Sequence, residues 1–107
     1  MTPDEIRAQL VQVGREQARA HDVIEQLEVE YERAELEAQS VADRAFLAAV
    51  GNIEERKAVA REASLTVADV ALVSRAAYNR ARSKAKFLEM ESMRLQSLLK
   101  SVQLEGA

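Results

Sequence analysis

The residues best suited to chemistry are a run of cations in the second half of the chain. Between Asp69 and Glu89 the sequence contains no acidic residue but holds five arginines and lysines. Cations repeated along a rigid helix can follow a polyanion backbone, and each one displaces a condensed counterion when it neutralises a phosphate. This run therefore predicts a nucleic-acid-binding surface. Its members are Arg75, Arg80, Arg82, Lys84 and Lys86.

Several cations of the second half share one face of the helix that we expect there. At about 100° per residue, six of them fall within about 60° of one another, opposite the apolar Leu88 and Leu95. Base stacking also needs aromatic side chains, and only Tyr78 and Phe87 lie in the run. Tyr78 suits helix packing or base stacking equally, whereas Phe87, next to Leu88, is expected in the core. The six cations are Lys57, Arg61, Arg75, Arg82, Lys86 and Lys100.

The competing interpretation of these cations is that they pair with acids inside the fold. Residues 1–55 hold 13 acids and 5 bases, and residues 56–107 hold 5 acids and 10 bases, so a net charge of −3 conceals −8 and +5. If the chain folds back near Gly51, the acidic stretch 16–37 lies along 66–87, where charges beside a helix interface commonly pair. The groups that would meet are Glu25, Glu28, Glu32 and Glu35 with Arg75, Arg80 and Lys84.

No arrangement of residues predicts catalysis. His21 and Glu25 stand four residues apart, as metal ligands on a helix can. Without a second histidine or any cysteine, we expect this pair on a solvated helix surface. The three glycines are isolated, so they form no phosphate-cradling loop. We therefore expect a non-enzymatic protein with no catalytic residues, metal or cofactor.

The composition predicts long helices. The chain is 48% hydrophobic, yet 19 of its residues are alanine and only 4% are aromatic. Alanine has the highest helix propensity and buries little area, which favours long helices over a thick globule. The charged fraction of 31%, rich in Glu, Arg and Lys, is typical of coiled coils.

A heptad repeat runs through the first half of the chain. Its interface positions alternate in steps of four and three, and only Gln17 among thirteen is not apolar. Such a repeat predicts a helix that supercoils around a partner. Thr2 and Pro3 predict an N-cap and a first helical position, with Glu5 completing a capping box, so this helix should span about 3–49. The positions are Ile6, Leu10, Val13, Gln17, Ala20, Ile24, Leu27, Tyr31, Ala34, Ala38, Val41, Ala45 and Ala48.

A turn is predicted over 50–52, followed by a second helix over about 53–104. Gly51 can take the left-handed conformation that ends a helix, and Asn52 can cap the next one. The hydroxyl and β-branched residues of 64–67 could allow a kink or a short break in the second helix. Its expected interface positions are Ala60, Ala63, Val67, Val70, Ser74, Ala77, Ala81, Lys84, Leu88, Glu91, Leu95, Leu98 and Val102.

These elements predict an all-α fold, a long antiparallel helical hairpin or coiled coil, in a single domain over residues 1–107. Because alanine is small, the interface of this hairpin buries little apolar area on each helix. We therefore expect a homo-oligomer in which another subunit covers the outer apolar residues. The number of subunits stays open, as does the choice between a closed hairpin and helices swapped between chains. The outer apolar residues are Leu36, Leu47, Leu72, Met90, Met93, Leu99 and Leu104.

The expected location is the cytoplasm. The chain has no cysteine, and no apolar run approaches the ~20 residues that cross a bilayer. Its first residues are acidic, whereas a signal peptide begins basic and continues apolar. We expect no membrane partner.

Three stretches of the second half resemble a known family. Residues 51–58 (GNIEERKA), 78–86 (YNRARSKAK) and 93–100 (MRLQSLLK) are similar to the UvsY-like recombination mediators of tailed bacteriophages. The resemblance covers about residues 50–102. It implies an oligomer that binds single-stranded DNA and helps a RecA-like recombinase displace single-strand-binding protein. The DNA contacts that it implies are Arg80, Arg82, Lys84, Lys86, Arg94 and Lys100.

Two functions from different classes follow. The first is this mediator activity in the cytoplasm of a bacterial host, with Arg75 added to the DNA contacts by the acid-free run. The second is a structural or adaptor coiled coil that acts through protein contacts, such as a phage assembly factor or an inhibitor of a host protein. In that case the acidic and basic side chains pair with each other in the hairpin, and the exposed outer apolar residues bind another protein.

Overall fold

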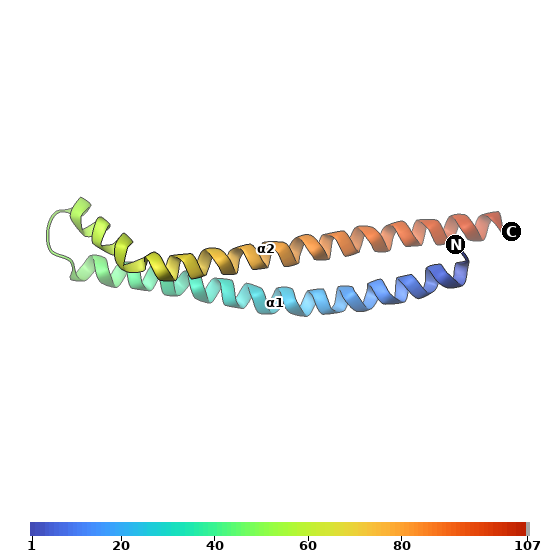
Figure 1. The fold of residues 1–107 in the computed structure, drawn as a ribbon, viewed down its shortest axis with the longest axis horizontal. Coiled ribbons are helices and arrows are strands. Elements are labelled where there is room, and N and C mark those ends of the chain that lie inside the picture. Colours follow the sequence, from blue (N-terminus) through green and yellow to red (C-terminus); the bar gives the residue numbers. More distant parts are fainter. Residues whose placement is uncertain (107) are drawn as a thin grey trace. The chain divides into compact units, whose positions relative to one another are not determined.

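The structure of the chain, a computed structural model, describes residues 1–106. It consists of helix α1, Pro3–Ala48, and helix α2, Ile53–Glu105, with no strand among the described residues. A short turn joins the helices, which run in opposite directions (Figure 1). The predicted all-α helical hairpin is therefore confirmed.

The helix ends follow from their capping residues. The Thr2 Oγ1 accepts a hydrogen bond from the backbone N–H of Glu5 at 3.2 Å. At the turn, Gly51 adopts a φ of 122°, which other residues rarely reach. The Asn52 Oδ1 then accepts the N–H of Glu55 at 2.8 Å, and the Asn52 Nδ2 donates to the Glu55 Oε1 at 3.1 Å. The Asn52 side chain thus caps the first turn of α2, and the Glu55 side chain holds it in place through the amide nitrogen.

The hairpin divides into two compact units, each built from parts of both helices. The terminal unit comprises Met1–Glu25 and Arg80–Ala107, and the turn unit comprises Gln26–Asn79. In the terminal unit the blue start of α1 lies beside the red end of α2, and in the turn unit the green end of α1 lies beside the yellow start of α2 (Figure 1).

The terminal unit has a core of large aliphatic side chains. Ile6, Val13 and Leu95 are buried against one another, and Leu88 is also buried. Four half-buried residues surround this cluster, and Leu99 is one of them. The prediction that Leu99 lies outside the interface is therefore wrong. The four surrounding residues are Leu10, Leu98, Leu99 and Val102.

The turn unit has a thinner interface. Its only fully buried hydrophobic residues among those described are Ala60 and Ala71. One contact near the turn was not expected from the sequence: the Arg56 Nε donates to the backbone carbonyl of Phe46 at 3.1 Å, and its guanidinium lies 4.3 Å from the centre of the Phe46 ring. The hydrogen bond and the cation–π contact together hold the start of α2 against the end of α1.

The interface positions of α1 are confirmed, because all thirteen except Ala48 are buried or half-buried. Those of α2 need a correction. Ala63, Val70 and Lys84 are exposed, and the next residue along the chain takes each interface place. At the first of these sites the hydroxyl of Ser64 donates to the Ala60 carbonyl at 2.8 Å, so the serine faces the interface without an unsatisfied polar group. The residues found at the interface instead are Ser64, Ala71 and Ala85.

Helix α2 continues through residues 64–67 without a break. Its axis changes direction in this yellow-green part of the helix (Figure 1). The hydrogen bond from Ser64 to the carbonyl four residues earlier is a contact that commonly bends helices.

Candidate nucleic-acid interface

The seven cations predicted to bind nucleic acid are all exposed, but they divide between the two units. Arg75 belongs to the turn unit. The other six lie on the part of α2 that belongs to the terminal unit, so the candidate site is built there. These six are Arg80, Arg82, Lys84, Lys86, Arg94 and Lys100.

An exposed aromatic residue lies among these cations. Phe87 is 63% exposed, so the prediction that it lies in the core is wrong. Its neighbour Leu88 takes the buried position, and Phe87 is rotated about 100° away from it around the helix axis. Arg80 precedes Phe87 by seven residues and Arg94 follows it by seven, so the three side chains share one face of α2. We call this arrangement the Phe87 row.

Arg94 in the Phe87 row is held by a carboxylate. Its Nε donates to the Glu91 Oε2 at 3.2 Å, and its Nη2 donates to the other oxygen. The hydrogen bond from Arg94 lowers the pKa of the Glu91 carboxyl, while partial burial opposes that shift. Glu91 in turn raises the pKa of Arg94. This pairing fixes the position of the guanidinium but reduces the charge that it offers to a phosphate.

The competing interpretation expects ion pairs across the helix interface for Arg80 and Lys84, and none is found there among the described residues. The ion pairs Asp4–Arg7, His21–Glu25, Glu54–Lys57 and Glu91–Arg94 each join residues three or four apart on one helix. Within residues 1–106, Arg80, Lys84 and Lys86 form no ion pair with an acid of α1. Arg80 and Lys86 are exposed to solvent, whereas Lys84 lines a hollow together with Glu16 and Arg19 of α1.

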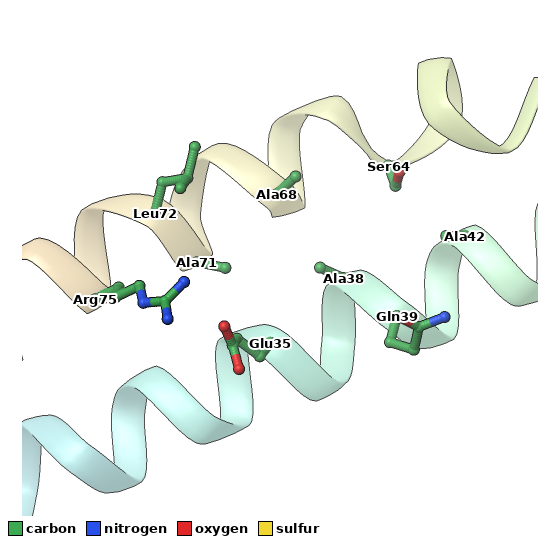
Figure 2. Close-up of a pocket in the computed structure, with 9 residues that line it drawn as sticks. All are labelled: Glu35, Ala38, Gln39, Ala42, Ser64, Ala68, Ala71, Leu72 and Arg75. Carbon is green, nitrogen blue, oxygen red and sulfur yellow. The ribbon is translucent and has the colours of Figure 1, made fainter. Parts of the chain in front are cut away.

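The turn unit uses its aromatic residues differently. The rings of Tyr31 and Tyr78 stack with centres 5.7 Å apart and planes 7° apart, so Tyr78 packs across the helix interface. The Arg75 guanidinium lies 5.7 Å from the centre of the Tyr31 ring. Figure 2 shows the Arg75 and Glu35 side chains pointing toward each other from opposite helices. Arg75 is thus engaged within the turn unit.

Glu35 also sets the chemistry of Tyr31. A side-chain hydrogen bond with Glu35 raises the pKa of the Tyr31 phenol, and desolvation raises it further. Arg75 acts in the opposite direction because its positive charge favours the phenolate. The balance keeps Tyr31 neutral beyond the pH range of an ordinary tyrosine.

The histidine considered as a metal ligand lies at the surface. The His21 Nε2 is 3.2 Å from the Glu25 Oε1, and both side chains are about two-thirds or more exposed. Across residues 1–106, no three metal-ligating side chains gather at one place. Neither helix, as far as it is described, is long and apolar enough to cross a membrane.

Comparison of the chain with protein-family models, curated proteins and solved structures found no match.

Proposed function

We propose that this chain is a non-enzymatic protein that binds single-stranded DNA through the terminal unit and assists the loading of a RecA-like recombinase. The observation that carries the proposal is the exposed Phe87 between Arg80 and Arg94 on one face of α2. Proteins that bind single strands without sequence preference combine stacking aromatic side chains with cations that contact the backbone.

The geometry favours a single strand over a duplex. The ring of Phe87 can stack on an unpaired base, while Arg80 and Lys84, which both precede it along α2, contact phosphates on one side of that base. Lys86 lies about 100° from Phe87 around the helix axis and extends the positive surface, and Lys100 lies farther round at about 140°. A duplex would offer no unstacked base to Phe87, so stacking would contribute nothing to its affinity.

A recombination mediator must do more than bind DNA, because the recombinase has to replace it on the strand. A protein that holds the strand through a few contacts can compete with single-strand-binding protein and then give way to the recombinase filament. The resemblance of residues 50–102 to UvsY-like mediators supports this part of the proposal. Its protein partners would be the recombinase and the single-strand-binding protein.

A titration of fluorescently labelled oligonucleotide with wild-type protein and two variants tests the proposal. Phe87→Ala should weaken binding about 5- to 150-fold, because stacking contributes about 1–3 kcal/mol per base. Met93→Ala is the matched control, since Met93 is equally exposed but lies outside the Phe87 row. Equal affinity of Phe87→Ala and wild type would refute the stacking role.

The mediator step needs its own measurement. Wild-type protein should speed recombinase assembly on a strand already covered by single-strand-binding protein, and Phe87→Ala should do so less well at equal concentration. If wild-type protein binds DNA but leaves the assembly rate unchanged, the chain binds DNA without acting as a mediator.

The adaptor function is the alternative, and the exposed apolar residues of the turn unit favour it. Changing the exposed cations Arg80, Lys86 and Lys100 of the terminal unit together to Gln separates the two functions. Loss of DNA binding with an unchanged assembly state favours the mediator, whereas a changed assembly state or stability favours the adaptor.

A further inference from the structure

A hollow lies between α1 and α2 in the terminal unit, and we call it the Lys84 hollow. Its volume is about 320 Å³. Three of the side chains that line it are small or apolar, and the other three are charged, two positively and one negatively. The hollow therefore combines an apolar surface with groups that can bind both an anion and a hydrogen-bond donor. The residues that line it are Glu16, Arg19, Ala20, Val23, Ala81 and Lys84.

The charged groups of the Lys84 hollow do not neutralise one another. Among the described residues, no ion pair joins Glu16 to Arg19 or to Lys84. Glu16 is half-buried, and its Oε1 accepts a hydrogen bond from the Gln12 Nε2 at 3.5 Å. A carboxylate has room for further donors, so Glu16 can still accept a hydrogen bond from a ligand. Arg19 and Lys84 are exposed, so both can contact a phosphate.

The Lys84 hollow adjoins the Phe87 row. Lys84 precedes Phe87 by three residues, which rotates it about 60° around the axis of α2. The rotation is toward the buried Leu88, and therefore toward α1. Arg19 lines the same hollow from α1. A strand with one base stacked on Phe87 can therefore continue over Lys84 and the hollow to reach Arg19.

The charges of α2 favour this path over one that follows the helix toward its C-terminal end. Glu91 follows Phe87 by four residues and lies about 40° from it around the axis, so a phosphate on that side meets a carboxylate. The guanidinium of Arg94 is already bound to Glu91 there. From Arg80 to Phe87, by contrast, α2 carries no acidic residue. The phosphate that precedes or follows the stacked base is therefore attracted toward Lys84.

We infer that the Lys84 hollow receives one unpaired nucleotide of a strand that crosses from α2 to α1, an inference that rests on the proposed DNA binding. The base lies on the apolar lining, and the Glu16 carboxylate accepts a hydrogen bond from its exocyclic amino group. Lys84 contacts the phosphate between this nucleotide and the base on Phe87, and Arg19 contacts the phosphate on the α1 side. Cytosine carries an amino group where thymine carries a carbonyl oxygen, so the hollow prefers cytosine to thymine.

The salt dependence of binding to a labelled oligonucleotide of deoxycytidine tests the role of Arg19. Arg19→Gln should reduce the slope of the logarithm of the binding constant against the logarithm of the salt concentration by about 0.7. Arg7→Gln is the matched control and should leave the slope unchanged. Arg7 lies on the same helix in the same unit, but about 120° from Arg19 around the axis, and it pairs with Asp4 at 3.1 Å.

The result with Arg80→Gln separates this inference from the proposed function. If Arg80→Gln reduces the slope and Arg19→Gln does not, the inference is overturned while DNA binding by the Phe87 row stands. Equal reductions in Arg19→Gln and Arg7→Gln would also overturn it, because the effect would then be one of total charge. If the wild-type protein does not bind at about 50 mM salt, both fail.

A comparison of deoxycytidine and thymidine oligonucleotides tests the position of the base. Wild-type protein should bind the deoxycytidine strand about 5-fold more tightly, as one net hydrogen bond would produce. Glu16→Ala should remove this preference, and the alanine keeps the helix because of its high helix propensity. Phe87→Ala should weaken the binding of both strands and preserve their ratio, because stacking on an aromatic ring tolerates any base. Equal affinity of the wild type for the two strands, or a preference that Glu16→Ala leaves unchanged, overturns the inference.

Discussion

Leu95 and Ile6 are the two large side chains that are fully buried in the terminal unit. Leu95 is 1% exposed and packs against Ile6 and Val13. Leu95→Ala removes three carbon groups from this cluster, and each buried group is worth about 0.8 kcal/mol. A residual cavity adds to that loss, so the expected cost is about 3 kcal/mol, near the lower end of the range for buried leucines because two packed helices can partly close the gap.

Urea unfolding followed by circular dichroism measures this cost, at one fixed protein concentration so that association does not shift the midpoint. Leu104→Ala is the control, since Leu104 is on the same helix and 70% exposed. It should change the free energy of unfolding by less than about 0.5 kcal/mol. Equal effects of the two substitutions would show that the terminal unit has no core at Leu95, and the described packing would be refuted.

Two further predictions concern glycine and tyrosine. Gly14→Ala should stabilise the chain by about 1 kcal/mol, because Gly14 lies in α1 and an added Cβ would meet open space. Gly51→Ala should destabilise the chain by about 1–3 kcal/mol, because Gly51 has a positive φ and an added Cβ would collide with the Glu55 side chain. Thermal unfolding of both variants checks the opposite signs. In a Tyr78→Phe background, the phenolate absorbance of Tyr31 should appear at a pH above 10, because its pKa is raised, and Glu35→Gln should bring the transition back toward that value. Tyr31 in the unfolded chain ionises at a lower pH than in the folded chain, so the free energy of unfolding should fall as the pH rises from 10 toward the folded pKa. If Glu35→Gln leaves the pH of Tyr31 ionisation unchanged, the hydrogen bond with Glu35 is not what raises this pKa.

Much of the fold could be predicted because its signals are local. The heptad repeat located the interface of α1, and the glycine and asparagine of the turn supplied the conformation and the cap that reverse the chain. The position of the interface on α2 was harder to predict. At 63 and 64 the sequence offers alanine followed by serine, and either fits a small-residue interface. Only the bond from the Ser64 hydroxyl to the helix backbone resolves the choice.

The cations of the candidate nucleic-acid interface could be predicted from the sequence, but the position of Phe87 and the contacts of Arg75 could not. Charge alone placed the seven cations at the surface, where the structure finds them. Phe87 was misplaced because two adjacent large apolar residues, Phe87 and Leu88, compete for one buried position, and sequence spacing alone did not decide between them. The engagement of Arg75 with Tyr31 depends on contact between residues 44 apart in the chain, which helix periodicity does not report.

The salt dependence of single-stranded DNA binding tests the central claim most directly. Binding constants of wild-type protein and Arg80→Gln should be measured from about 50 to 200 mM salt, with Arg61→Gln in the turn unit as the control. The logarithm of the binding constant should fall linearly with the logarithm of the salt concentration, and Arg80→Gln should reduce the slope by about 0.7 while Arg61→Gln leaves it unchanged. No binding at about 50 mM salt, or equal slopes for wild type and Arg80→Gln, would contradict a nucleic-acid interface on the terminal unit.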